Sequence, residues 1–251
     1  MFDRFAQNYF LFFFSIIPIS VIVGPSISLV NILIIDFSFL FIIFYKKNFS
    51  FIKKDAFKYL FLLYIYLIFN SLTSLESEIG LNRNLGFIRI IILFIAINYF
   101  FNNREFLNKV LFIWFIIICF VVIDVYIEYF RGENILGYGK IYGYRVVSFF
   151  KDEPIVGGYI YAFYLLIIGF LSEKFNFKNK ILILSLFFLL CIFITGERSN
   201  SIKALIGIVT FYAFFKEYKP IHKLILSTGC LVLIISIIFN SSFLKQRYIG
   251  Q

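Results

Sequence analysis

Nine apolar stretches, each close to the length that crosses a lipid bilayer as a helix, make up most of this 251-residue sequence. A membrane-spanning helix needs about 20 mostly apolar residues, with a range of roughly 17–25. A helix also bonds its backbone polar groups internally, as the bilayer interior requires. The sequence therefore predicts an all-α, polytopic transmembrane helix bundle forming a single domain over residues 1–251. The nine expected spans are Ala6–Val23, Ser26–Tyr45, Ala56–Ser74, Leu85–Phe101, Val110–Phe130, Ile155–Leu171, Ile181–Thr195, Ile202–Phe215 and Ile221–Phe239.

The composition argues against a soluble globular protein and excludes several chemistries. Hydrophobic residues make up 61% of the chain, and the mean hydropathy is +0.93, whereas globular chains are roughly 45–50% apolar. The three cysteines lie inside apolar stretches, which indicates small core residues rather than a disulfide or metal framework. His222, the only histidine, lies in a lysine-rich loop, so the chain cannot build a His-based metal site or catalytic triad. We therefore expect no metal and no cofactor.

The net charge of +10 is better explained by membrane topology than by nucleic-acid binding. Lysine and arginine concentrate in short loops on the cytoplasmic side of membrane proteins. With the N-terminus inside, twelve of the 16 lysines are cytoplasmic, most of them in clusters at Lys46–Lys58, Lys174–Lys180 and Lys216–Lys223. If the seventh and eighth spans were one span interrupted at Gly196, the last two clusters would face opposite sides. We therefore predict that these spans form a hairpin.

Arginine has the opposite distribution, because six of the eight arginines are predicted to lie outside. Three of them, Arg89, Arg145 and Arg198, come from separate stretches that reach the same outer boundary. The rigid donor fork of arginine matches phosphate and carboxylate groups, so an anion-binding site is one explanation. The alternative is a set of loop salt bridges with the nearby acidic residues Glu76, Glu78, Glu128, Glu133, Asp152, Glu153 and Glu197.

Two aspartates lie within expected spans: Asp36 in the second and Asp124 near the outer end of the fifth. A charged side chain at the bilayer centre costs about 2.5–3.5 kcal/mol on insertion scales and usually faces protein or water. Each aspartate either belongs to a proton or ion path or pairs with serine, tyrosine or arginine. The sequence leaves both explanations open.

Two outer segments combine basic, acidic and small residues. The main outer loop, residues 131–154, is rich in glycine, and its end runs into the next span as RVVSFFKDEPIVGGYI over residues 145–160. The turn between the seventh and eighth spans reads TGERS over residues 195–199. Arginine at the membrane edge can bind an anionic group at the level of the lipid headgroups. The alternative for the second segment is a turn with a local Glu197–Arg198 pair.

In the order of these features, the sequence resembles the O-antigen ligase and O-antigen polymerase group of membrane glycosyltransferases. Four pieces carry the resemblance: PISVIVGPSISLVNILIIDFSF over Pro18–Phe39, Arg89, the RVVSFFKDEPIVGGY segment and TGERS. The family pattern is an arginine, then Gly-x-Phe, an aspartate or asparagine, and a glycine before a span. Ser148 and Lys151 stand where the family often has glycine, and the matching residues are Arg145, Phe150, Asp152 and Gly157.

The resemblance implies glycan transfer on the periplasmic face of the inner (cytoplasmic) membrane. The donor would be a saccharide on undecaprenyl diphosphate, and the acceptor would be lipid A-core in a ligase or a lipid-linked glycan in a polymerase. Family members use neither a metal nor a nucleotide sugar. Arg89, Arg145 and Arg198 would bind the lipid diphosphate and stabilise the charge that grows on this leaving group, with Asp152 and Glu197 as their partners in the empty site.

One departure from the family pattern bears on catalysis. Family members carry a large late outer loop, which supplies a functional histidine in the ligases, and further spans after it. Residues 240–251 would be the start of that loop, and no residue here matches the histidine, so we assign no catalytic residue. The sequence would then be a truncated or a divergent member. Two other functions stay open: a transporter or flippase of lipid-linked saccharides built on Asp36 and Asp124, and a non-enzymatic scaffold or inactive fragment.

Overall fold

The computed structural model describes residues 2–139, 145–151, 153–175 and 178–214, together with seven single residues between 228 and 246. All of the regular elements in these residues are helical, and no strand occurs among them. The all-α prediction is therefore confirmed for this portion of the chain. The chain divides into two compact units, Met1–Val110 and Leu111–Gln251.

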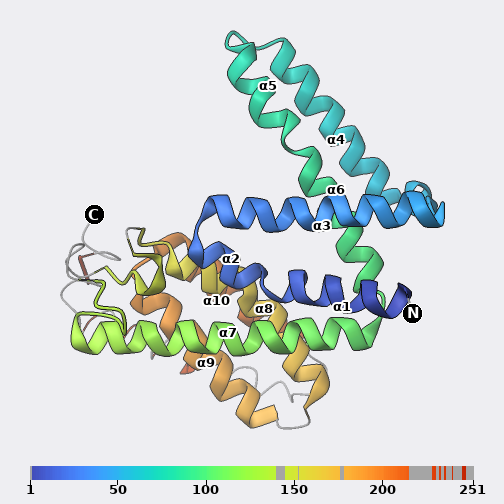
Figure 1. The fold of residues 1–251 in the computed structure, drawn as a ribbon. Coiled ribbons are helices and arrows are strands. Elements are labelled where there is room, and N and C mark those ends of the chain that lie inside the picture. Colours follow the sequence, from blue (N-terminus) through green and yellow to red (C-terminus); the bar gives the residue numbers. More distant parts are fainter. Residues whose placement is uncertain are drawn as a thin grey trace. The chain divides into compact units, whose positions relative to one another are not determined.

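The first unit contains six α-helices, one short 3₁₀ helix and the start of a further helix (Figure 1). Helix α3 packs against α2 and α6, and α5 turns back along α4. The elements are α1 (Phe2–Ser15), α2 (Ile17–Val23), α3 (Pro25–Lys46), η1 (Ser50–Lys53), α4 (Asp55–Leu72), α5 (Ser77–Leu85), α6 (Ile88–Phe100) and the beginning of α7 (Arg104–Arg131).

Proline and glycine divide the first apolar stretch into two helices. Pro18 has no backbone N–H and its ring crowds the preceding turn, which kinks a helix. Helices α1 and α2 accordingly meet at an angle of 42°. Gly24 ends α2 with φ +143°, a conformation that other residues rarely adopt, and Pro25 then begins α3. The expected span Ala6–Val23 is thus a bent helix pair.

Phenylalanine supplies the core of the first unit. The ring of Phe100 on α6 stacks on Phe10 of α1, with ring centroids 4.2 Å apart, and on Phe106 of α7, with centroids 5.4 Å apart. Phe39 of α3 meets Phe100 edge-on at 6.3 Å. All four side chains are buried, so this aromatic cluster joins four helices of the unit.

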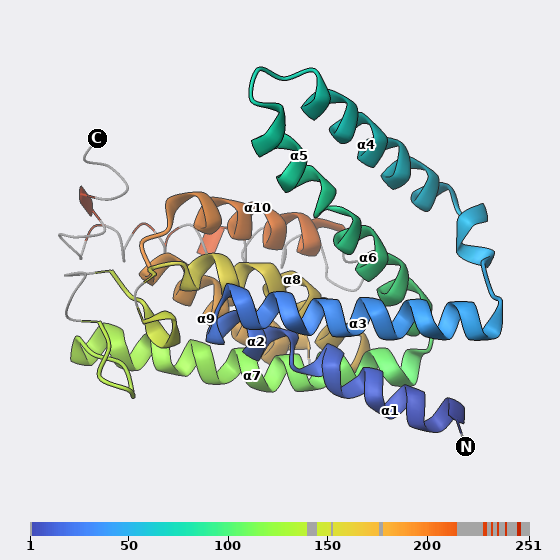
Figure 2. The same ribbon diagram turned by 45° about the horizontal axis from the view of Figure 1, so that its top comes forward.

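The second unit packs α8 (Val156–Lys174), α9 (Lys178–Ile194) and α10 (Arg198–Phe214) against one another (Figure 2). The hydroxyl of Tyr164 donates to the Ser185 carbonyl at 2.9 Å, and the hydroxyls of Ser185 and Tyr212 lie 3.0 Å apart. These buried contacts link all three helices. Helix α7 joins them by stacking Tyr126 on Phe187 of α9, with centroids 4.5 Å apart.

Five described helical stretches are long and apolar enough to cross a membrane, or six if the α1–α2 pair counts as one span. These helices are consistent with a multi-pass membrane protein, and the nine spans and the side of the N-terminus stay predictions. Helices α9 and α10 are separate and packed together, with their break at Thr195–Glu197. The expected ninth span, Ile221–Phe239, and the C-terminal segment 240–251 lie outside the described residues, apart from a few single positions.

Candidate functional site

An open pocket with a volume of about 590 Å³ lies between α4, α5 and α6 in the first unit. It brings Arg89, a residue that the sequence had pointed to, together with a second arginine six residues earlier. Its lining contains two arginines and no acidic side chain. The polar lining residues are Asn70, Ser71, Ser74, Arg83, Asn84 and Arg89.

Close packing of α4 and α5 shapes this pocket. The amide nitrogen of Asn84 donates to Ser71 Oγ at 2.6 Å and to the Leu67 carbonyl at 3.2 Å. A Cβ atom at Gly80 would lie 3.3 Å from Ser71 Cβ, so glycine lets the two helices approach here. Arg83 was missed as a site residue. It is one of the six arginines predicted to lie outside, and it stands between Asn82 and Asn84 in a short polar segment.

Asp36 is buried in the first unit, with 3% of its surface exposed. Neither carboxylate oxygen has a hydrogen-bond partner among the described residues. The sequence left open that Asp36 pairs with serine, tyrosine or arginine. Among the described residues, neither serine nor tyrosine bonds to its carboxylate.

In the second unit, two acidic residues of α7 hold the segment that carries Arg145. Glu128 accepts the backbone N–H of Val147 at 2.9 Å and that of Ser148 at 2.6 Å. Asp124, one helical turn earlier, accepts the Ser148 hydroxyl at 2.6 Å. Ser148 is fully buried with φ +49°, an uncommon conformation for a residue other than glycine. These carboxylates thus hold a strained turn against the end of α7.

The same network fixes the beginning of the outer loop. The second carboxylate oxygen of Asp124 accepts the Ile135 N–H at 3.0 Å. The amide nitrogen of Asn134 donates to the Ser148 carbonyl at 2.7 Å, and its oxygen accepts the Tyr138 N–H at 2.8 Å. Asp124 therefore pairs with serine and backbone groups, one of the two explanations considered from the sequence. Glu128, first considered as a loop salt-bridge residue, binds backbone groups as well.

Glu197 holds the turn between α9 and α10 against the start of α8. Its carboxylate accepts the N–H of Gly157 at 2.7 Å and that of Gly158 at 2.9 Å, and the Asn200 amide donates to it at 2.6 Å. The first N–H groups of a helix have no partner inside the helix, and the helix dipole favours negative charge there. Both glycines relieve close contacts, because a Cβ at Gly157 would collide with Thr195 Oγ1 and one at Gly158 would lie 2.8 Å from the Asn200 amide nitrogen.

These contacts place two of the predicted arginines on ordered segments. Arg145 precedes the buried residues Val146 and Val147, and its Nε is buried without a hydrogen-bond partner among the described residues. Arg198 is the first residue of α10 and directly follows Glu197. The Glu197 carboxylate contacts Gly157, Gly158 and Asn200. Its role as an arginine partner stays a prediction. The other predicted partner, Asp152, lies outside the described residues.

Arg89 belongs to the first unit, whereas Arg145 and Arg198 belong to the second. The predicted convergence of the three arginines on one ligand stays a prediction. Within the described ranges, no group of three or more histidine, cysteine or acidic side chains is placed to hold a metal ion. Comparison of the chain with protein-family models, with curated proteins and with solved structures finds no match.

Proposed function

We propose that this protein is a membrane glycan transferase of the O-antigen ligase or polymerase type. In this proposal it moves a saccharide from undecaprenyl diphosphate to lipid A-core or to a lipid-linked glycan. The transfer takes place on the periplasmic side of the inner membrane, with nine spans and a cytoplasmic N-terminus. The observation that carries the proposal is the pocket lined by Arg83 and Arg89, which has arginine and amide donors and no acidic lining residue.

The chemistry of that pocket fits a diphosphate. A guanidinium binds phosphate oxygens through two parallel N–H bonds, and the amides of Asn70 and Asn84 add neutral polar groups beside Arg83 and Arg89. Donors fixed around a leaving diphosphate stabilise the charge that develops as the glycosyl bond breaks. The exposed apolar residues of α4 leave a lipid-facing surface next to this pocket, as a substrate with a polyprenyl tail requires.

The two ordered segments of the second unit supply the remaining predicted donors. Glu128 binds backbone N–H groups that closely follow Arg145. Glu197, which directly precedes Arg198, binds those of Gly157 and Gly158. Both contacts limit the motion of the segments that carry the arginines. Donors that are already positioned need no reorganisation at the moment of reaction. For all three arginines to share one diphosphate, their guanidinium groups must approach within roughly 20 Å of one another, because each has to reach hydrogen-bonding distance of the ligand.

The proposed sidedness gives a topology prediction. The lysine clusters are expected in the cytoplasm, because short basic loops stay on that side. Reporter fusions at Asn48, Asn176 and His222 should all give cytoplasmic signals, and a fusion at Leu136 should give a periplasmic signal. A periplasmic signal at any of the first three positions would contradict the nine-span arrangement.

Arginine-to-lysine changes test the pocket. Arg89→Lys keeps the charge and removes the donor fork, so we expect the affinity for undecaprenyl diphosphate to fall about tenfold, the loss of roughly one charge-assisted hydrogen bond. Binding is measured on the purified protein in neutral detergent. Glycan transfer in proteoliposomes, from a lipid diphosphate donor to a lipid-linked acceptor, should fall by a similar factor.

Arg131→Lys is the matched control, because Arg131 is an exposed arginine that ends α7 and does not line the pocket. It should leave binding and transfer unchanged. If Arg89→Lys and Arg83→Lys both matched the wild type, recognition of the diphosphate by arginine forks in this pocket would be wrong. Transfer that is absent from the wild type under all donor and acceptor combinations would reject the enzyme assignment.

The burial of Asp36 favours one other function, transport of a lipid-linked saccharide coupled to a proton or cation. An intramembrane carboxylate without hydrogen-bond donors suits reversible binding of a positive charge. Asp36→Asn separates the two functions. It should abolish coupled transport in vesicles if the protein is a transporter and leave glycan transfer intact if the protein is a transferase.

A further inference from the structure

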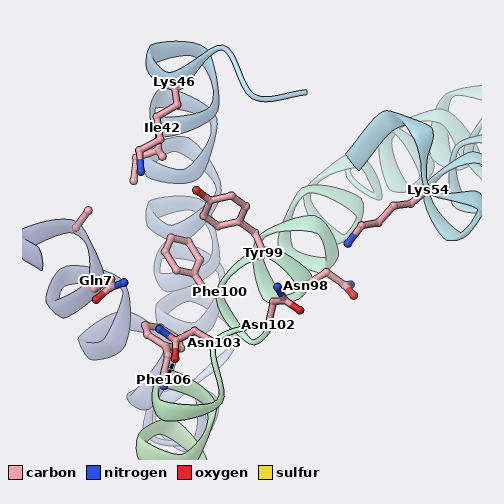
Figure 3. Close-up of a pocket in the computed structure, with 11 residues that line it drawn as sticks. Gln7, Ile42, Lys46, Lys54, Asn98, Tyr99, Phe100, Asn102, Asn103 and Phe106 are labelled. Atoms are coloured by element: carbon pink, nitrogen blue, oxygen red, sulfur yellow. Dashed lines mark hydrogen bonds between the residues drawn. The ribbon is translucent and has the colours of Figure 1, made fainter. Parts of the chain in front are cut away.

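A second pocket in the first unit has a volume of about 630 Å³ and does not share residues with the arginine pocket. Two lysines and four side-chain amides line it, and no acidic side chain is among its lining residues. Figure 3 shows Tyr99 between the two lysines, with Asn98 below the end of Lys54 in this view. The basic and amide-bearing lining residues are Gln7, Lys46, Lys54, Asn98, Asn102 and Asn103.

The amides of this pocket present both hydrogen-bond donors and acceptors. The oxygen of Asn103 accepts the N–H groups of Glu105 at 2.9 Å and Phe106 at 3.3 Å, which caps the start of α7 and leaves its amide nitrogen to donate. Asn98 does the reverse, because its amide nitrogen donates to the Phe94 carbonyl at 2.8 Å and leaves its oxygen to accept. Such a mixture suits an anion that also carries hydroxyl groups.

An apolar cleft adjoins the polar pocket and shares Lys54, Asn98 and Tyr99 with it. The cleft is narrow, with a volume of about 70 Å³. Its other walls are mostly aromatic and branched aliphatic side chains from α3, α4, α6 and the segment between α3 and α4. They include Ile43, Phe51, Phe57, Phe94 and Ile95. A polar basic pocket that opens into an apolar cleft has the layout of a site for an amphiphile.

We propose that the two cavities together bind an anionic phospholipid. The phosphate lies between Lys46 and Lys54, the hydroxyl groups of the headgroup meet the amides, and the first carbons of an acyl chain enter the apolar cleft. Lys46 ends α3 and Lys54 precedes α4. Both belong to the lysine cluster predicted to face the cytoplasm, where basic pockets between spans bind lipid headgroups. This lipid site is separate from the arginine pocket and does not depend on glycan transfer.

Lipid binding to the purified protein in neutral detergent tests the site, with native mass spectrometry as the readout. Phosphatidylglycerol should bind in preference to phosphatidylcholine with the same acyl chains. The double variant Lys46→Gln/Lys54→Gln should weaken phosphatidylglycerol binding about tenfold or more, since each lysine contributes attraction to the anionic headgroup. Lys46 and Lys54 are both exposed, so the thermal unfolding midpoint of the double variant should equal that of the wild type.

The matched control is Lys47→Gln/Lys58→Gln, which removes the same charge from the same lysine cluster at two residues that do not line the pocket. It should keep the affinity within about twofold of the wild type. Equal losses in both double variants would show attraction to the general positive charge and would overturn the site. Competition with inorganic phosphate is the last part of the experiment. If millimolar phosphate displaced the lipid in a manner that depended on Lys46 and Lys54, a free phosphate and not a lipid would be the ligand.

Discussion

Replacing Glu128 with alanine is expected to lower the free energy of unfolding by about 2–6 kcal/mol. The carboxylate accepts the N–H groups of Val147 and Ser148, and all three residues are buried. A buried donor that loses its partner costs roughly 1–3 kcal/mol, and two donors are affected. The loss is measured by unfolding the purified protein in mixed detergent micelles and following helix content by circular dichroism.

Glu128→Gln sharpens this test because it keeps the shape of the side chain. A glutamine offers one acceptor oxygen, and its NH₂ group would face the second backbone N–H. We therefore expect its stability to lie between those of the wild type and the alanine variant. Glu105→Gln, at the exposed start of the same helix, removes only an ion pair to Lys109 and should leave the unfolding transition unchanged. Wild-type stability in both Glu128 variants would contradict the role of this carboxylate.

The helices could be predicted from the sequence because their signals are local. Apolar runs of bilayer length mark α3, α4, α7 and α8. The structure places α3, α4 and α8 within three residues of the expected bounds, whereas α7 begins at Arg104, six residues before the expected span. The bend in the first stretch, which was not predicted, also has a local cause, Pro18 at the start of α2. The predicted hairpin at Gly196 depended on where the lysines lie, and the described residues do contain two separate packed helices there.

The roles of the acidic residues could not be predicted in the same way. Any backbone N–H can donate to a carboxylate, so the residue types in the sequence do not indicate which N–H groups bind Glu128 and Glu197. Glu197 reaches Gly157, 40 positions away in the sequence, only because α8 packs against the turn that follows α9. The Glu197–Arg198 pair considered for the TGERS turn was based on neighbours in sequence. The tertiary contact with Gly157 does not follow from those neighbours.

Arg83 shows the same limit for the candidate site. Arg89 was predicted because arginine on the outer side of a span needs an explanation other than topology. Arg83 had the same property but belongs to a polar segment that could have been a simple loop. Its position beside Arg89 follows from the return of α5 along α4, which Asn84 and Ser71 fix. A pocket made by helix packing therefore added a residue that the sequence pattern had not selected.

The double glycine at the start of α8 makes room for the contact with Glu197, because Thr195, Glu197 and Asn200 lie close to the positions that Cβ atoms would occupy there. A Cβ atom at Gly157 would collide with Thr195 Oγ1 and lie 2.9 Å from Glu197 Oε1. Thr195 is buried, and its hydroxyl is already bonded to the Ile192 carbonyl at 2.7 Å. The hydroxyl therefore has little room to move away.

Gly157→Ala is accordingly expected to destabilise the protein by about 1–3 kcal/mol, the usual effect of overpacking a filled site. Gly169→Ala is the matched control on the same helix, because a Cβ atom there meets nothing within 4 Å. Alanine favours the helix over glycine by up to about 1 kcal/mol, so this control should be neutral or stabilising. Both variants are compared by the same detergent unfolding measurement. Equal stability of the two would mean that the turn between α9 and α10 does not dock on α8 through Glu197, since then no close contact would distinguish Gly157 from Gly169.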